Sequence, residues 1–382
     1  MRLVLALQGC AAVLYVLAQA GRLVPTETWA AARPLDALVT GGNVAVAMLL
    51  ALAGFSLATR VLQARPRGPL PALRRGAGDL GLVVAAVALV CAGAVVVDAT
   101  DDSDGADWST TSRSVLRVLS FGWNLWLRDN PGSGRADLTS LWFFSVLVQL
   151  MLVVLVLVAV LGRRPIALAA VLGVAAVACA VERVVVLDQE GWFAVSLGTV
   201  TRGDAFFLGA AAAALSMRFR SSPATAAAVL GGSSLVLVGT VLAASMVTVE
   251  ETFRVLAPTV AVLTALAALA AVQVPDPRTL AVDLLGRDAV AVPGRHWYLL
   301  VAWSPFVAVT VGRRLVDQPT GVAAVVAVLA TVALVAGSAW LLGQVASRAG
   351  TAWSAADVGR RRLIAEVRSD DRRSGGQPPA HG

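Results

Sequence analysis

Residues 5–21, LALQGCAAVLYVLAQAG, make up an apolar stretch that contains two glutamines, Gln8 and Gln19. A run of this kind is typical of a helix that crosses a membrane. The two glutamines are eleven residues apart, which in a helix is three turns plus roughly 20°, so both amides lie on one face, about 16 Å apart. We expect them either to line a polar cavity or to hydrogen-bond with neighbouring helices.

The composition of the whole chain indicates an integral membrane protein. Of its 382 residues, 58% are hydrophobic and 14% are charged, and the mean hydropathy is +0.77. Runs of about 20 apolar residues are needed to span a bilayer, and the sequence predicts an all-α, multi-pass bundle of about ten transmembrane helices. The predicted spans, of which the sixth and ninth are short, are 3–20, 43–60, 80–97, 141–161, 166–186, 204–217, 226–246, 258–274, 297–312 and 321–345.

The positions of the arginines predict the orientation of the chain. All 31 basic residues are arginine, and the loop after the second predicted span contains Arg60, Arg65, Arg67, Arg74 and Arg75. Cytoplasmic loops are enriched in basic residues, so we expect this loop and both termini on the cytoplasmic side of a cell membrane. The arginines are not interleaved with aromatic residues as in a nucleic-acid interface. Membrane topology therefore explains the net charge of +7, and no nucleic-acid partner is expected.

The same topology predicts the domains and the longest external loop. A transmembrane domain is expected over 1–346 and a cytoplasmic, partly disordered tail over 347–382. The acidic residues 98–107 are expected to form a solvated external connector. Residues 114–127, SVLRVLSFGWNLWL, form either a helix in the membrane interface or a re-entrant wall of the membrane domain.

No pattern of metal ligands or phosphate-binding glycines occurs in the sequence. The three cysteines, Cys10, Cys91 and Cys179, all lie in apolar runs, where a thiol behaves as a small hydrophobic group. His/Cys spacing typical of a metal site and glycine-rich phosphate loops are both missing. We therefore expect neither a metal nor a bound cofactor.

Four charged residues lie in or beside the predicted spans, near their outer ends. Charges inside a membrane are costly and are often functional. Glu182 and Arg183 are adjacent in the fifth span, and Arg202 and Asp204 precede or begin the sixth. Either each pair neutralises itself at the interface, or the residues form a polar site that opens outward.

Four segments resemble, in order, the helix motifs of one family of membrane proteins. The first is NVAVAMLLALAGFSLATR (43–60), which resembles the motif Gly-Val-Asp-x-Phe-Phe-x-x-Ser-Gly-Phe through Val46, Gly54 and Phe55. The second is LWFFSVLVQLMLVV (141–154), which resembles Leu-Trp-Ser-Leu-x-x-Glu-x-Gln-Phe-Tyr through Leu141, Trp142 and Gln149.

The other two motifs lie in the sixth and ninth predicted spans. TRGDAFFLGAAAAAL (201–215) is similar to Arg-x-Asp-x-x-x-x-Gly through Arg202, Asp204 and Gly209. GRHWYLLVAWSPFVAV (294–309) resembles Gly-x-x-Ser-Tyr-x-x-Tyr-Leu-x-His-x-Pro through Gly294, Trp297 or Tyr298, and Pro305. By these motifs the chain resembles the membrane-bound acyltransferase-3 family.

The resemblance implies transfer of an acyl group from a cytoplasmic donor, such as acyl-CoA, to a glycan or lipid of the cell envelope. Membrane lipids and an envelope acceptor are the partners it implies. In the family, the first helix carries an arginine and, eleven residues later, a histidine that are thought to act in catalysis. Gln8 and Gln19 occupy these positions here. We therefore expect this chain not to transfer acyl groups by the mechanism of its relatives.

Other family positions have also lost their polar groups. The second-helix Asp is Ala47, the fourth-helix Glu is Leu147 or Val148, and the late His is Trp303 or Ser304. No other histidine or carboxylate is expected to reach the middle of the first helix. Two further interpretations stay open: a catalytically degenerate scaffold or partner in envelope-polymer synthesis, and a transporter that uses a polar cavity.

Overall fold

The computed structural model describes residues 1–22, 40–64, 68–100, 108–274, 293–312 and, within 323–341, all but 324 and 339. Every regular element in these ranges is a helix. The chain divides into two compact units, Met1–Ala336 and Gly337–Gly382. The first unit holds the helical bundle. The expected tail, 347–382, lies outside the described residues.

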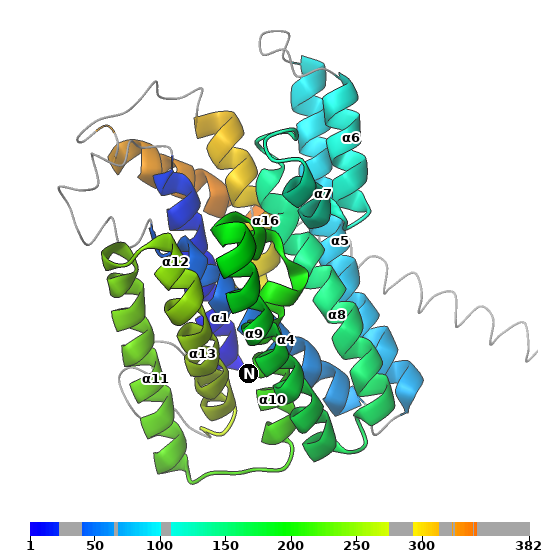
Figure 1. Cartoon of the computed structure of the whole chain (residues 1–382), viewed down its shortest axis with the longest axis vertical. Helices are drawn as coiled ribbons and strands as arrows, with labels where there is room; N and C mark the ends of the chain where they lie inside the picture. The colour runs from blue at the N-terminus through cyan, green and yellow to red at the C-terminus, as the bar shows by residue number, and fades with distance from the viewer. Residues whose placement is uncertain are drawn as a thin grey trace, which may run out of the picture. The chain divides into compact units, whose positions relative to one another are not determined.

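Helices of the first unit lie side by side with alternating chain direction (Figure 1). The long ones are α1 (Arg2–Gly21), α4 (Gly42–Ala64), α5 (Pro69–Thr100), α8 (Trp142–Leu161), α9 (Pro165–Leu197), α10 (Thr199–Ser216), α11 (Pro223–Ala243) and α13 (Ala257–Ala271). The short helix α12 (Val249–Glu251) and the π-helical turn η4 (Thr252–Leu256) lead into α13, and α16 (Trp297–Val307) continues into the π-helical turn η5 (Ala308–Gly312).

Seven helices in the described ranges are long and apolar enough to cross a membrane, which confirms the all-α membrane bundle. The expected number of ten is not confirmed. The sixth predicted span is α10, which has 18 residues and carries Arg202 and Asp204. The ninth and tenth correspond to shorter apolar helices, Trp297–Thr310 and Val325–Ser338.

Helix α4 is the centre of the bundle. It packs against α1, α5, α8, α10 and α13, and nearly all of its residues are buried. Two glycines allow its backbone to approach that of α10. A Cβ atom on Gly54 would lie 2.1 Å from the Phe206 carbonyl oxygen, and one on Gly209 would lie 1.8 Å from the Ala51 carbonyl oxygen. Small residues permit such contacts between helices in membranes.

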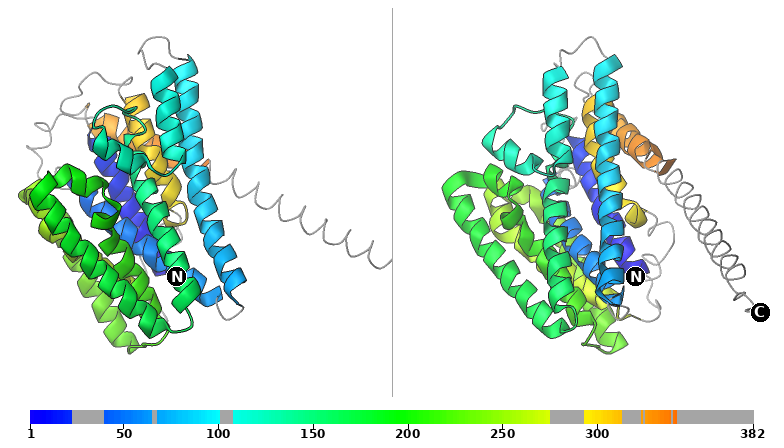
Figure 2. Two further views of the ribbon diagram at one scale, coloured as in Figure 1. Left: turned by 45° about the vertical axis from the view of Figure 1, so that its right-hand side comes forward. Right: turned by 90° about the vertical axis from the view of Figure 1, so that its right-hand side faces the viewer.

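Helices α6 (Trp108–Leu119) and α7 (Trp123–Asp129) lie at the same end of the bundle as the end of α5 (Figure 2). Helix α7 packs into the protein. Trp123 is fully buried and donates to the Leu138 carbonyl at 3.0 Å, and Asn124, also fully buried, donates to the Leu197 carbonyl at 3.0 Å. These contacts fix α7 against the bundle, and the position of residues 114–127 relative to the membrane stays a prediction.

The opposite end of the bundle is the arginine-rich end. It contains the start of α1, the end of α4, the starts of α5 and α16, and the turns between α8 and α9 and between α10 and α11. Its described arginines are Arg2, Arg60, Arg74, Arg75, Arg163, Arg164, Arg218, Arg220 and Arg295. The sequence assigned the loops at this end to the cytoplasm, and that orientation stays a prediction.

The contact between α4 and α10 can be tested with two matched alanine substitutions. Gly209→Ala would place a methyl group against a backbone oxygen, so we expect a loss of about 1–3 kcal/mol in stability. Gly232→Ala is the control, because a Cβ there meets nothing within 4 Å and alanine favours a helix over glycine by up to about 1 kcal/mol. Thermal unfolding in detergent measures both, and equal melting temperatures would contradict the packing described.

Candidate functional site

Gln8 lines a cavity of about 90 Å³ at the arginine-rich end. Its amide is 2% exposed and donates to the Leu52 carbonyl at 3.4 Å, so the glutamine both faces the cavity and bonds to a neighbouring helix. Segments from five helices surround the space. Its lining residues are Leu5, Gln8, Ala53, Leu57, Arg60, Asp79, Leu82, Val83, Leu147, Met151, Gly294, Arg295, Trp297 and Tyr298.

An ion pair joins α4 to α5 in the wall of this cavity. The Arg60 Nε lies 3.2 Å from the Asp79 Oδ2, and the two side chains are 43% and 16% exposed. Arg60 Nε also donates to the Ser56 carbonyl at 3.3 Å. The Asp79 Oδ2 atom has no hydrogen-bond partner of suitable geometry among the described residues. Gln8 and an incompletely bonded carboxylate thus face one space.

Helix α16 reaches the cavity because its first residues approach α1 closely. A Cβ on Gly294 would lie 1.7 Å from the Leu5 carbonyl oxygen, so only glycine fits there without displacing α1. Arg295, Trp297 and Tyr298 follow it into the lining. The glycine on which the family resemblance partly rests therefore has a packing role.

Gln19 does not line the Gln8 cavity. It is buried, and its Oε1 accepts from Arg22 at 3.4 Å. An aromatic row runs from the cavity toward it: Trp297 packs edge-on against Phe143 at 6.3 Å between ring centroids, and Phe143 lies 6.5 Å from Tyr15. The two family positions thus have separate surroundings.

The charged residues of α9 and α10 form a buried pair. Arg183 Nη1 and Asp204 Oδ2 are 2.7 Å apart, and both side chains are 3% exposed. Glu182 lies on the exposed face of α9 and forms none of the ion pairs found in the described ranges. Of the four residues proposed from sequence, the structure brings Arg183, Asp204 and Arg202 into the bundle and leaves Glu182 outside it.

Arg202 is a second buried cation beside this pair. It donates from Nε to the Ser196 carbonyl at 3.2 Å, and its guanidinium carbon lies 4.6 Å from the ring centre of Phe253 and 5.5 Å from that of Trp142. Aromatic faces attract a guanidinium. One of its nitrogens, Nη2, has no hydrogen-bond partner in the described structure, so the aromatic rings take the place of a carboxylate.

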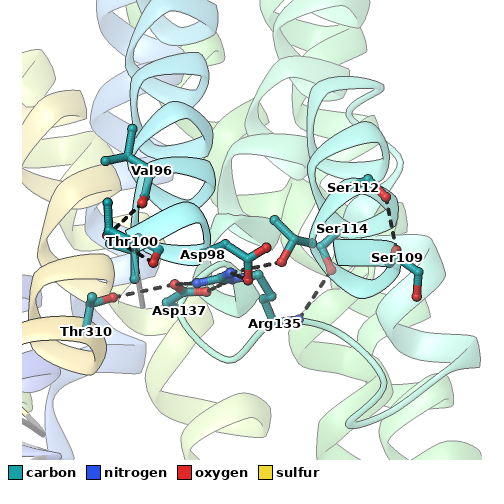
Figure 3. A network of polar contacts seen from close by, with 11 residues as sticks. Val96, Asp98, Thr100, Ser109, Ser112, Ser114, Arg135, Asp137 and Thr310 are labelled. Carbon is teal, nitrogen blue, oxygen red and sulfur yellow. Dashed lines mark hydrogen bonds and ion pairs between the residues drawn. The ribbon is translucent and has the colours of Figure 1, made fainter. Parts of the chain in front are cut away.

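Arg135 organises a third polar cluster, at the end opposite the arginine-rich end (Figure 3). It bonds Asp98 of α5 at 3.0 Å, both oxygens of Asp137 at 3.0 and 2.8 Å, and Thr111 of α6 at 2.9 Å. The hydrogen bonds that Arg135 donates to Asp137 are the main reason that the pKa of Arg135 is raised. Asp98, expected in a solvated connector, is only 8% exposed and is joined to α6 through Arg135, which also bonds Thr111. Residues 101–107 of that connector lie outside the described ranges.

Gln149, one of the family motif residues, fastens α7 to α8. Its Nε2 donates to the Phe121 carbonyl at 2.7 Å and to Asn124 Oδ1 at 3.2 Å. Thr199 at the start of α10 bonds to Gln149 Oε1. These hydrogen bonds of Gln149 connect helices, so their role is structural.

In the described ranges no three side chains of His, Cys, Asp or Glu come together as a metal site requires.

Asp79 is a neighbour of Gln8 that the sequence does not predict. No carboxylate is expected from the sequence at the middle of the first helix, but Asp79 shares a cavity with Gln8 near the start of that helix. The available signal was a single acidic residue, Asp79, between an arginine-rich loop and the third apolar run. An unbalanced carboxylate at a span boundary favours a partner on a neighbouring helix.

The helical bundle, its polar cavity and its buried charges define a multi-pass membrane protein with a candidate site at the arginine-rich end. The family described as "Acyltransferase domain" matches residues 6–343. The chain belongs to this acyltransferase-3 family. Comparisons with curated proteins and with solved structures find no significant match.

Because Asp204 is in the buried ion pair and Glu182 is not, we expect removal of the Asp204 charge to cost much more stability than removal of the Glu182 charge. Asp204→Asn would leave Arg183 and Arg202 buried without a counter-charge, and breaking a buried ion pair typically costs about 3–5 kcal/mol. Glu182→Gln, on the exposed face of α9 next to Arg183, is the control, with an expected change within about 0.5 kcal/mol. Chemical or thermal unfolding in detergent compares them, and equal effects would show that the Arg183–Asp204 pair does not stabilise the bundle.

Proposed function

We propose that this protein transfers an acyl group from acyl-CoA to a hydroxyl of an envelope glycan or lipid, at the Gln8 cavity and without the Arg–His pair of its relatives. The observation that carries the proposal is the cavity itself. Gln8 stands where the family has its arginine, and that position borders a hollow lined by Arg60, Asp79, Arg295 and Tyr298. A family member that had lost all chemistry would have no need of charged groups there.

The charges around the cavity favour a donor that carries phosphates. Arg60 and Arg295 line it, and Arg74 and Arg75 lie in the same turn region of α5. Arginines bind phosphates well, because the guanidinium presents several donors in a fixed plane. Under the predicted topology this end faces the cytoplasm, where acyl-CoA is available.

The size of the cavity favours binding of the reacting end of the donor alone. Pockets that enclose a whole drug-sized ligand have volumes of about 300–1,000 Å³, whereas this one has about 90 Å³. Its walls are largely aliphatic between the polar groups. A short acyl group and a hydroxyl therefore suit it better than a long acyl chain, and the nucleotide would remain outside.

A second function, a scaffold or partner in envelope-polymer synthesis, is favoured by one observation. The aromatic row of Tyr15, Phe143 and Trp297 fills the side of α1 between the two glutamines. A base at the Gln19 position would then lack open space toward Gln8. Under this second function, the cavity is what remains of the family's active site, and the protein acts by binding other proteins of envelope-polymer synthesis.

Turnover of acetyl-CoA by the purified full chain, with an envelope lipid and glycan extract as acceptor, tests the proposal. We expect release of free CoA thiol from the wild type above the background rate, because the cavity would position the thioester and the hydroxyl next to each other. The Gln8→Arg, Gln19→His double variant restores the family pair, and its turnover shows whether the helical bundle still positions that pair for catalysis.

The outcomes separate the two functions. Wild-type turnover above the rate with heat-denatured protein supports acyl transfer. Turnover by the double variant alone would mean that the bundle can still support the family mechanism but that the wild-type chain is inactive. That result supports the scaffold function. Turnover by neither protein would contradict acyl transfer by this chain.

A further inference from the structure

The Gln8 cavity contains a carboxylate that none of the family motifs includes. Asp79 lies in the first part of α5, directly before the apolar run that begins at residue 80. Its side chain is 16% exposed, and its only ion-pair partner among the described residues is Arg60. It is also the only Asp or Glu in the described lining of this cavity.

Arg60 leaves this carboxylate open to a further contact. Arg60 is 43% exposed, and its Nε lies 3.2 Å from Asp79 Oδ2 but donates its hydrogen to the Ser56 carbonyl. The Asp79 Oδ2 atom has no hydrogen bond in the described structure although it is buried. Buried carboxylate oxygens are normally hydrogen-bonded. A hydroxyl entering the cavity would supply the missing donor.

We propose that Asp79 is the proton acceptor of this protein, in place of the histidine that the family carries on its first helix. The inference rests on the acyl transfer proposed above. Acyl transfer to a hydroxyl needs a base within hydrogen-bond reach of that hydroxyl. The surroundings of Asp79 meet this need at the Gln8 position, which the aromatic row separates from Gln19.

In the proposed step the acceptor oxygen bonds to the carbonyl carbon of the thioester while its proton passes to the Asp79 carboxylate. The tetrahedral intermediate then collapses, the carbon–sulfur bond breaks, and the leaving thiolate takes the proton from Asp79. The products are an ester and a free thiol, and Asp79 returns to its carboxylate form. Donors near the carbonyl oxygen would stabilise the intermediate; Gln8 and Tyr298 line the same space.

Other titratable groups surround Asp79 and bear on the pH dependence. They are Arg60 on α4, Arg75 on α5, and Arg295 and Tyr298 at the start of α16; α1 and α8 contribute Gln8, Leu5, Leu147 and Met151 to the lining. His296 lies between two lining residues but does not itself line the cavity. Burial, and next the charge of Arg295, lower the pKa of His296.

The alternative role of Asp79 is purely structural, with its ion pair to Arg60 holding α4 and α5 together. In that case, removing either partner would lower the stability of the protein equally. Turnover would then fall only as far as stability falls. A proton acceptor would behave differently, because Arg60→Gln leaves the base in place whereas Asp79→Asn removes it. The pH profile separates the two roles further when stability is recorded at each pH, because protonation of a purely structural Asp79 would lower turnover only where the protein also loses stability.

The test measures release of CoA thiol from acetyl-CoA, with the envelope extract as acceptor, by the full-length wild type and by Asp79→Asn, Asp79→Glu, Arg60→Gln and His296→Gln. Thermal unfolding is recorded for each protein. We expect Asp79→Asn to lower turnover by about 10²–10⁴ and to abolish the acid limb of the profile. Arg60→Gln should be less affected than Asp79→Asn, and His296→Gln should match the wild type.

The outcomes distinguish failure of the Asp79 proposal from failure of acyl transfer. A folded Asp79→Asn variant with wild-type turnover and an unchanged pH profile would overturn the role of Asp79 and leave acyl transfer standing. Wild-type protein without turnover would overturn acyl transfer and the role of Asp79 with it. Should Asp79→Asn not fold, Asp79→Glu decides: a moved acid limb supports the proposal, and a profile identical to the wild type overturns it.

Discussion

The close approach of α4 and α10 is the contact on which the bundle depends. Gly54 and Gly209 bring the two backbones together, and a Cβ at either position would lie about 2 Å or less from a carbonyl oxygen of the facing helix. Because α4 also contacts α1, α5, α8 and α13, moving it outward would displace most of its neighbours. Both the Gln8 cavity and the Arg183–Asp204 pair are built on this central contact.

The residues shared with the family motifs mainly have structural roles. Gly54, Gly209 and Gly294 permit close backbone contacts, and Gln149 ties α7 to α8. The resemblance assigns catalysis to two other positions, and these carry Gln8 and Gln19 in place of arginine and histidine. Helix packing and chemistry are specified by different side chains, so a fold can persist while its chemistry changes.

The sequence predicted the all-α membrane bundle, though not its number of spans, because a long apolar run specifies a helix by local composition alone. Its weaker predictions concerned contacts between distant residues. Asp98 looked like part of a solvated acidic loop, but Arg135, far along the chain, buries it. Asp79 and Gln8 meet only because α4, α5 and α16 pack around the start of α1. Neither pairing leaves a local pattern in the sequence.

The central claim is that acyl chemistry in this protein has its place at the Gln8 cavity. The most direct measurement is an experimental structure of the full chain in lipid nanodiscs, bound to a non-hydrolysable acetyl-CoA analogue. The account predicts the acyl carbonyl of the analogue between Gln8 and Asp79, with its phosphates at the arginine-rich end. An analogue bound at Arg202 or Arg135, with the Gln8 cavity empty, would contradict it.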